Sequence, residues 1–399
     1  MELQNIMSMD KDYFFNVYGE RNPVCFQYGK GMKLWDSENK EYYDFLGGIA
    51  VNALGHSHPK LVGALKNQLD KFIHTSNLYY NEPQAKLAKT LVENSCADRV
   101  FFCNSGAEAN EGAIKLARIY FKKKGIENKY EIITLTNSFH GRTLTTVAAT
   151  GQEKYQKPYK PLTPGFKHVP INDINALKEA ITPSTCAIMM EPIQGESGVH
   201  PVTAEYLKEV KTLCEQNDLL LIFDEIQTGI GRTGKLFGYQ HLGIEPDIFT
   251  LAKALGGGIP IGALCAKQHA ASAFEPGDHG TTFGGNAFAC TAGLTVMETL
   301  YEDNLIENAA KMGEYFKSKL LDLASKHIMI SEIRGTGLMI GLEFKEEIAK
   351  DIYKKLLECG FLVGCVGTKV LRFLPPLIVE QNDIDELTST LHKILSANA

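Results

Sequence analysis

Short apolar runs alternate with amphipathic segments through the middle of the chain. Five mostly apolar runs are bounded by turn-forming or polar residues: 100–103, 131–135, 186–190, 219–223 and 247–251. Such runs are typical of strands that are buried on both faces. Between them, residues 173–181 and 204–217 have the apolar spacing of amphipathic helices. The alternation predicts an α/β fold with a mainly parallel central sheet flanked by helices.

The two chain ends have a different pattern. Residues 29–45 alternate around an Asn-Lys pair and predict a hairpin, while long charged helices are expected after about Leu305. Residues 328–344 alternate again and contain three glycines, which predicts an α+β element. With 399 residues and 44% hydrophobic content, the chain is long enough for one large core and a smaller one. We expect a large domain at 56–305 and a small domain built from 1–55 and 306–399.

Composition narrows the class of protein. A net charge of −6 argues against binding to nucleic acid, and no apolar stretch is long enough for a membrane span. Nine scattered cysteines without a C-x-x-C pair favour reduced thiols, and the first residues lack the features of a signal peptide. His56 and His58 have no third ligand at a useful spacing, so no metal site is expected. We expect a soluble cytoplasmic protein.

Lys253 and Asp224 are the most informative pair of residues. Lys253 lies in an apolar, glycine-rich segment, and Asp224 ends a strand-like apolar run. Burial lowers the pKa of an amine and makes it nucleophilic. A lysine that bonds an aldehyde and an aspartate that keeps a pyridine nitrogen protonated are what pyridoxal 5'-phosphate requires. The alternatives are a surface lysine and an ordinary ion-pair partner at a strand end.

Two further motifs follow predicted strands. In residues 103–120, Ser105 can cap a helix and Gly106 allows close approach, so the helix start can bind a phosphate. In residues 137–143, Phe139 is suited to stack on a flat ring and Arg142 to grip a carboxylate. An ordinary capped helix and a polar loop are the alternatives. Because ligands bind at the carboxyl ends of parallel strands, we expect these side chains to lie together.

Residues 229–234 spell the G-x-G-x-x-G pattern of dinucleotide-binding proteins. That pattern should open a long amphipathic helix, but another glycine follows at once and no apolar stripe is sustained. Arg232 would also crowd the turn. We therefore do not expect nicotinamide or flavin binding.

Eight segments occur in order along the chain: 44–59 (DFLGGIAVNALGHSHP), 104–111 (NSGAEANE), 138–143 (SFHGRT), 191–198 (EPIQGESG), 223–234 (FDEIQTGIGRTG), 251–258 (LAKALGGG), 279–286 (HGTTFGGN) and 371–377 (LRFLPPL). Through them, almost the full length of the chain resembles the class III pyridoxal-phosphate-dependent aminotransferases. The resemblance implies the fold type I architecture, in which a large cofactor-binding domain carries a small α+β domain. Ser197 is a local departure from the glycine expected there.

The resemblance also implies roles for individual residues toward the cofactor. Ser105, Gly106 and Ala107 match the phosphate cradle, Phe139 the ring-stacking residue, Asp224 the partner of the pyridine nitrogen, and Gln227 a residue near the phenolic oxygen. Lys253 matches the lysine that bonds the cofactor and carries the proton. Thr282 matches a residue that reaches the phosphate of a neighbouring subunit, which implies a homodimer with shared active sites.

Substrate residues follow from the same resemblance. Arg142 would bind a distant carboxylate, and Arg372 the carboxylate next to the reacting carbon of glutamate or 2-oxoglutarate. Glu196 would pair with Arg372 when the donor reacts through a terminal amine. Gly19 stands where ornithine aminotransferases carry a tyrosine, which leaves room for an acyl group, and Thr281 is a further candidate substrate residue.

The reaction implied by the resemblance moves the terminal amino group of N2-acetylornithine to 2-oxoglutarate. Its products are N-acetylglutamate 5-semialdehyde and glutamate, as in arginine biosynthesis. Succinylornithine, succinyl-diaminopimelate, ornithine and 4-aminobutyrate are alternative donors. A pyridoxal-phosphate-dependent aminomutase and a non-catalytic binding protein are rivals from other classes. Arg372 together with Glu196 favours a transaminase with two substrates.

Overall fold

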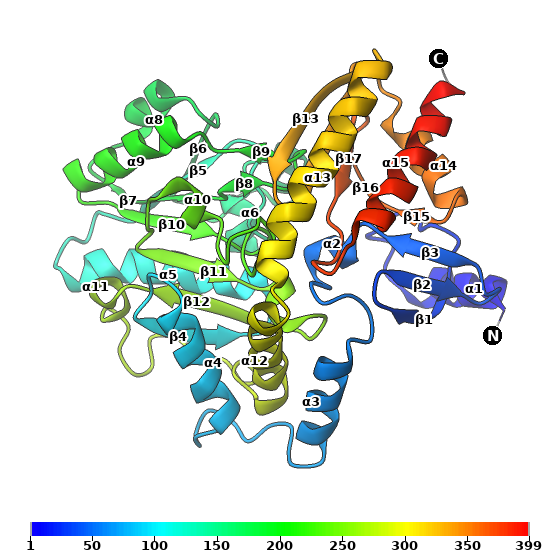
Figure 1. Cartoon of the computed structure of the whole chain (residues 1–399). Coiled ribbons are helices and arrows are strands. Elements are labelled where there is room, and N and C mark those ends of the chain that lie inside the picture. The colour runs from blue at the N-terminus through cyan, green and yellow to red at the C-terminus, as the bar shows by residue number, and fades with distance from the viewer. Residues whose placement is uncertain (1, 398–399) are drawn as a thin grey trace.

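The computed structural model describes residues 2–397, and a seven-stranded sheet forms its centre (Figure 1). In spatial order the strands are β4 (Arg99–Cys103), β12 (Gly262–Ala266), β11 (Ile248–Leu251), β10 (Leu220–Asp224), β7 (Thr185–Met190), β5 (Glu131–Leu135) and β6 (Phe166–Val169). β12 runs antiparallel to both of its neighbours, and the other strands are parallel to one another. The predicted α/β fold with a mainly parallel sheet is confirmed.

Five of these strands are the ones predicted from apolar runs, and their ends differ from the prediction by at most one residue. The prediction missed β6 and β12. β6 contains Lys167 and His168 and is only partly buried, whereas β12 begins with a glycine and is rich in small residues. Neither strand therefore has the continuous run of large apolar side chains by which the others are recognised.

Helices cover both faces of the central sheet, which explains why its strands are apolar throughout. α5 (Gly106–Lys123) and α11 (Gln268–Ala271) pack with Leu220 and Ile222 of β10, whereas Leu221 and Phe223 point into the opposite core. Helices on that opposite side are α4 (Glu82–Glu93), α8 (Ile174–Ala180), α9 (Ala204–Gln216) and α12 (Ala287–Glu302). The predicted helices at 173–181 and 204–217 correspond to α8 and α9.

Two smaller four-stranded sheets lie beside the large one (Figure 1). The first consists of β1 (Phe26–Lys30), β2 (Lys33–Asp36), β3 (Glu41–Asp44) and β15 (Phe361–Leu362). The second consists of β13 (Ile330–Thr336), β14 (Met339–Phe344), β17 (Val370–Phe373) and β16 (Gly364–Val366). β15 pairs with β3, so segments from the two ends of the chain share a sheet. The hairpin predicted at 29–45 is present; the domain boundaries stay a prediction.

The remaining helices are α1 (Leu3–Tyr13), α2 (Gly47–Ala50), α3 (Pro59–Leu69), α6 (Leu144–Ala149), α7 (Glu153–Gln156), α10 (Tyr239–Leu242), α13 (Leu305–Lys326), α14 (Ala349–Glu358) and α15 (Gln381–Ser396). Two 3-10 helices, η1 (Lys157–Tyr159) and η2 (Lys253–Gly256), and the strand pair β8 (Ile193–Gln194) and β9 (His200–Pro201) complete the described elements. α13 begins at Leu305, where a long charged helix was expected. Across residues 2–397, none of the helices has the length and apolar character needed to cross a membrane.

Candidate active site

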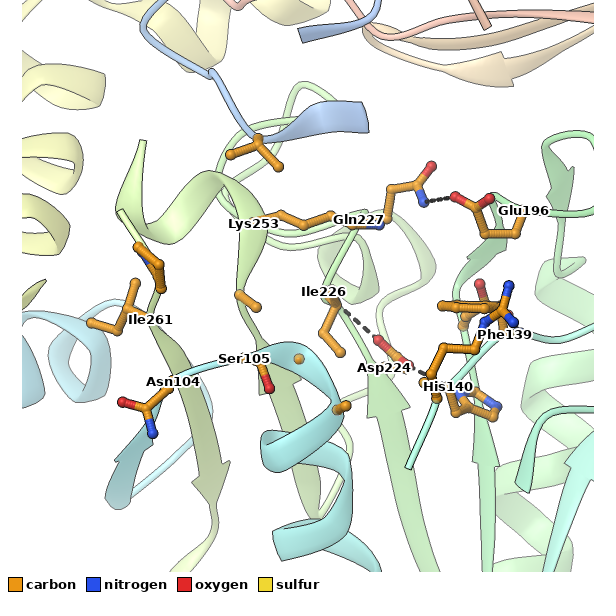
Figure 2. Close-up of a pocket in the computed structure, with 18 of the residues that line it drawn as sticks. Asn104, Ser105, Phe139, His140, Glu196, Asp224, Ile226, Gln227, Lys253 and Ile261 are labelled. Atoms are coloured by element: carbon orange, nitrogen blue, oxygen red, sulfur yellow. Dashed lines mark hydrogen bonds and ion pairs between the residues drawn. The ribbon is translucent and has the colours of Figure 1, made fainter. Parts of the chain in front are cut away.

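A cavity of about 400 Å³ lies at the carboxyl ends of β4, β5, β7, β10 and β11. Nine of the residues selected from the sequence line it: Ser105, Gly106, Ala107, Phe139, Arg142, Glu196, Asp224, Gln227 and Lys253 (Figure 2). They come from five separate stretches of sequence. The parallel strand order brings them together, because each stretch follows the carboxyl end of a strand at the same edge of the sheet.

Lys253 follows the end of β11 and extends toward Gln227 in Figure 2. Its backbone φ of 43° lies in the left-handed region, which is uncommon for a residue with a side chain and costs free energy. Burial lowers the pKa of the Lys253 amine, although the negative charge of Glu196 acts in the opposite direction. The uncharged, nucleophilic form of this amine is therefore reached at a lower pH than for an ordinary lysine.

Asp224 ends β10 with only 3% of its surface exposed. Its Oδ2 atom lies 2.8 Å from Nδ1 of His140 and accepts a hydrogen bond from Nδ2 of Asn110 at 2.8 Å. Its Oδ1 atom accepts from the backbone N–H of Ile226 at 3.1 Å. The sequence interpretation selected neither His140 nor Asn110, although His140 stands between the selected Phe139 and Arg142.

The start of α5 forms another wall of the cavity. Ser105 is the N-cap, and its hydroxyl accepts from the backbone N–H of Glu108 at 3.2 Å. A Cβ atom on Gly106 would lie 2.7 Å from Cδ1 of Ile226, so a side chain cannot be added without a shift. The first N–H groups of a helix have no acceptor within the helix. The start of this 18-residue helix is thus suited to an anionic group.

Phe139 and Arg142 occupy the loop after β5. The backbone N–H of Phe139 donates to Oε2 of buried Glu191 at 3.1 Å, and its ring meets that of Tyr155 edge-on with centroids 5.8 Å apart. The guanidinium of exposed Arg142 lies 3.8 Å from the ring centroid of Tyr155. Burial and the nearby charge of Asp224 raise the pKa of Glu191 well above its usual value. Glu191 is another cavity residue that the sequence interpretation did not select.

Glu196 lies in the loop between β8 and β9 and pairs with Arg372 of β17. Nη1 of Arg372 donates to Oε1 of Glu196 at 2.8 Å, and Nε2 of Gln227 donates to the same oxygen at 3.3 Å. Arg372 is 4% exposed and also donates to the backbone carbonyl of Gly195 at 2.8 Å. Burial alone would raise the pKa of Glu196, but the charges of Arg372 and Lys253 bring it below its usual value. Arg372 thus reaches the cavity through Glu196 without forming part of its wall.

Besides Arg372, three predicted residues lie outside the cavity wall. Thr281 accepts a hydrogen bond from Asn104 at 3.3 Å, so it lies behind the wall, and Thr282 is exposed on the surface. Gly19 is exposed, has φ of 68°, and belongs to a separate hollow beside α1. The structure of a single chain therefore does not bring Gly19 or Thr282 to the other site residues.

Residues 229–234 do not open a helix, since turns follow until the short α10 begins at Tyr239. Arg232 is fully buried there and donates to the carbonyl of Leu338 at 3.1 Å. The pattern therefore does not open a long helix, as the sequence interpretation expected, and Arg232 ties this turn to the backbone near Leu338.

The arrangement of donors and acceptors fits pyridoxal phosphate. The free helix N-terminus suits a phosphate, the crevice beside Phe139 suits a flat ring, and the Asp224 carboxylate suits a protonated ring nitrogen. Lys253 has the buried amine that an aldehyde requires.

Comparisons with known proteins agree with this geometry. Residues 15–395 match the family model described as aminotransferase class-III. The acetylornithine aminotransferase of Methanocaldococcus jannaschii is 54% identical over 396 residues, which cover 99% of each chain. A crystal structure of acetylornithine aminotransferase from Elizabethkingia anophelis is 33% identical with a TM-score of 0.89, and covers 100% of each chain. The ornithine aminotransferase of Toxoplasma gondii is 34% identical with a TM-score of 0.95, covering 100% of this chain and 96% of that one.

Proposed function

Because this chain belongs to the class III aminotransferase family, we propose that it moves the terminal amino group of N2-acetylornithine to 2-oxoglutarate. It is a pyridoxal-phosphate-dependent aminotransferase, which takes an amino donor and the 2-oxoglutarate/glutamate pair as substrates. The products would be N-acetylglutamate 5-semialdehyde and glutamate, as in arginine biosynthesis. The observation that carries the proposal is the contact of 2.8 Å between Glu196 and Arg372 beside the cavity.

We assign the cofactor roles as follows. Bound pyridoxal phosphate supplies an aldehyde that accepts the amino group and a ring that takes up electrons. Lys253 would hold the cofactor through its amine, and the same amine would carry a proton away from the substrate carbon that bears the amino group. The start of α5 from Ser105 to Ala107 would hold the phosphate, Phe139 would pack on the ring, and Gln227 would face the phenolic oxygen. Asp224 would keep the ring nitrogen protonated.

Glu196 and Arg372 would act as a charge switch between the two substrates. Glutamate and 2-oxoglutarate have a carboxylate beside the reacting carbon, and Arg372 binds it after Glu196 moves away. A donor that reacts through a terminal amine has no carboxylate there, so Glu196 stays paired with Arg372. The pairing is needed because an unpaired charge on a side chain that is 4% exposed costs several kcal/mol.

The remaining substrate roles rest on position and on the relatives. Arg142, exposed at the cavity edge, would hold the distant carboxylate of the donor. Gly19 would leave room for the acyl group, with Thr281 nearby, once a second chain completes the site. The 54% identity to acetylornithine aminotransferases supports acetyl as that group. Succinylornithine, succinyl-diaminopimelate, ornithine and 4-aminobutyrate are the donors against which this must be tested.

We also propose a cytoplasmic homodimer in which Thr282 of each chain approaches the phosphate of the other. The support is an exposed apolar patch beside Thr282, formed by Leu78, Tyr79, Tyr80 and Phe283. Asn77 donates to the carbonyl of Gly284 at 2.9 Å, which fixes the two segments of the patch side by side. Contiguous exposed aromatic residues of this kind mark protein interfaces. A second copy of the chain would cover them.

Single-turnover reactions of the pyridoxal form test the donor. We expect acetylornithine to react faster than ornithine or 4-aminobutyrate, because Gly19 accommodates the acyl group. We also expect it to react faster than succinylornithine, which the 54% identity to acetylornithine aminotransferases supports. A faster reaction with ornithine or 4-aminobutyrate would refute the proposed substrate while leaving the aminotransferase intact. Turnover without any 2-oxoglutarate would instead favour the aminomutase.

A further inference from the structure

Three donors surround the Asp224 carboxylate, and all of them are uncharged. Its Oδ2 atom receives hydrogen bonds from the side chains of His140 and Asn110, each at 2.8 Å, and Oδ1 receives one from the backbone of Ile226. A carboxylate offers about four lone-pair directions. Both directions on Oδ2 are used and one remains on Oδ1. No salt bridge with lysine or arginine is formed by Asp224 in the described part of the chain.

Asn110 is fully buried, and its orientation is fixed by its own partners. Its Nδ2 atom donates to the carbonyl of His140 at 2.7 Å and to Asp224, while its Oδ1 atom accepts from the hydroxyl of Thr250 at 2.7 Å. Thr250 pairs with Asp224 in the register of β10 and β11. The amide therefore cannot rotate without breaking hydrogen bonds to two neighbouring elements, and its N–H must point at Asp224.

His140 is held in one tautomer by the same arrangement. Its Nδ1 atom faces Asp224 and must donate, whereas its buried Nε2 atom has no hydrogen-bond partner among the described residues. A doubly protonated ring would leave a charged N–H buried without an acceptor, which costs far more than a bare ring nitrogen. The contacts of His140 thus match a ring that carries its proton on Nδ1. It donates to Asp224 without cancelling the carboxylate charge.

We propose that His140 and Asn110 are positioning residues that hold the Asp224 carboxylate turned toward the cavity, so that its free Oδ1 direction would accept a hydrogen bond from the protonated ring nitrogen of the cofactor. Neutral donors stabilise the carboxylate and leave its full charge for that proton. A cationic partner in their place would satisfy the carboxylate and weaken its hold on the ring nitrogen. The inference rests on the proposed role of Asp224 toward the pyridine ring.

Variants at the two positions separate orientation from simple packing. His140→Leu and Asn110→Leu remove the donors while keeping an apolar volume. His140→Asn retains an N–H close to the position of Nδ1, so it should restore what His140→Leu loses. Thr250→Val removes only the hydroxyl that orients Asn110 and should have a smaller effect in the same direction. His327→Leu is the control for losing a buried histidine, since His327 bonds His392 in another part of the molecule.

The direct readout is the 15N chemical shift of the ring nitrogen in enzyme loaded with ring-labelled pyridoxal phosphate. We expect a protonated nitrogen in the unchanged enzyme, in His140→Asn and in His327→Leu. In His140→Leu and Asn110→Leu we expect the shift to move toward the neutral nitrogen, and kcat of both half-reactions to fall about tenfold with little change in KM. Where Asn110→Leu does not fold, Thr250→Val takes its place.

Asp224→Asn separates failure of this inference from failure of the role on which it rests. If Asp224→Asn moves the ring-nitrogen shift and His140→Leu and Asn110→Leu do not, the positioning role is wrong and Asp224 keeps its own. If none of the three moves the shift, the role of Asp224 is wrong as well. A loss in His140→Leu that His140→Asn does not recover would assign His140 to packing alone.

Discussion

Asp224 and Glu196 are carboxylates on the wall of the same cavity, but they are held by different kinds of partner. Asp224 is buried, belongs to the large sheet, and receives only neutral donors. Glu196 is more exposed, with 24% of its side chain accessible, and pairs with the cation Arg372 from a different sheet. A carboxylate with neutral donors keeps its charge for a permanent ligand. A carboxylate that is paired with a cation can leave that cation to the carboxylate of a substrate.

The charges of both carboxylates act on the pKa of Lys253. Loss of this lysine should have the largest effect on the rates. In Lys253→Ala we expect both half-reactions to fall by about 10⁴ or more, because nucleophile and proton carrier are lost together. The visible absorbance of the lysine-bound cofactor should also disappear. Stopped-flow spectra of the two half-reactions measure both. Retained absorbance would show that another amine bonds the cofactor.

Asp224→Ala should affect the two half-reactions equally. The ring nitrogen loses its anionic partner whichever substrate is bound, so we expect a fall of about 10³ with each. Burst rates with glutamate and with acetylornithine supply the comparison, and the melting temperature reports any general loss of structure. A loss confined to one substrate would mean that Asp224 and Glu196 do not differ as described.

The pH dependence of donor choice should follow Glu196. The charges of Arg372 and Lys253 lower the pKa of Glu196 in the folded enzyme below about 4.3, the ordinary pKa of a glutamate. Its carboxylate therefore stays ionised to a lower pH than that of an exposed glutamate. The contribution of this pair to stability is therefore complete above the ordinary pKa and is lost as pH falls through the lower folded-state pKa. We expect the ratio of the acetylornithine and glutamate rates to be constant from about pH 8 down to about pH 5. A titration of this ratio near pH 7 would contradict the pairing.

Gly19→Tyr should produce the smallest effect. Gly19 is exposed in the hollow beside α1, and a Cβ atom added there would have no neighbouring atom of its own chain within 4 Å. If a second chain brings Gly19 to the site, the added ring should slow acetylornithine a few-fold, about 1 kcal/mol or less, and favour ornithine. Competition between the two donors gives the change in selectivity. Unchanged selectivity would place Gly19 outside the substrate site.

The parts of the site that lie on single motifs were predictable from sequence. Asp224 stands out because it ends an apolar strand, Lys253 because it follows one, and the helix start at Ser105 is a local pattern. The pairing of Glu196 with Arg372 joins residues 176 positions apart, and only a family resemblance could indicate it. Locally, Arg372 is simply a charged residue in a short strand.

His140 and Asn110 were missed because their roles depend on tertiary register. Asn110 reaches Asp224 only because α5 packs against β10 and β11. The orientation of the Asn110 amide depends on Thr250, which lies on β11 beside Asp224 of β10. A possible signal was the polar amide on the buried side of α5, four residues after Gly106. A buried Asn in an apolar helix face requires partners, and these were not visible in the sequence.

The most direct test of the difference between the two carboxylates is the pair of half-reaction rates in Glu196→Ala, each divided by the rate of the unchanged enzyme. Arg372 is left unpaired only when the donor has no carboxylate beside the reacting carbon. We therefore predict a fall of about tenfold to a hundredfold with acetylornithine and little change with glutamate. Equal losses with both substrates, or a loss with glutamate alone, would contradict the charge switch.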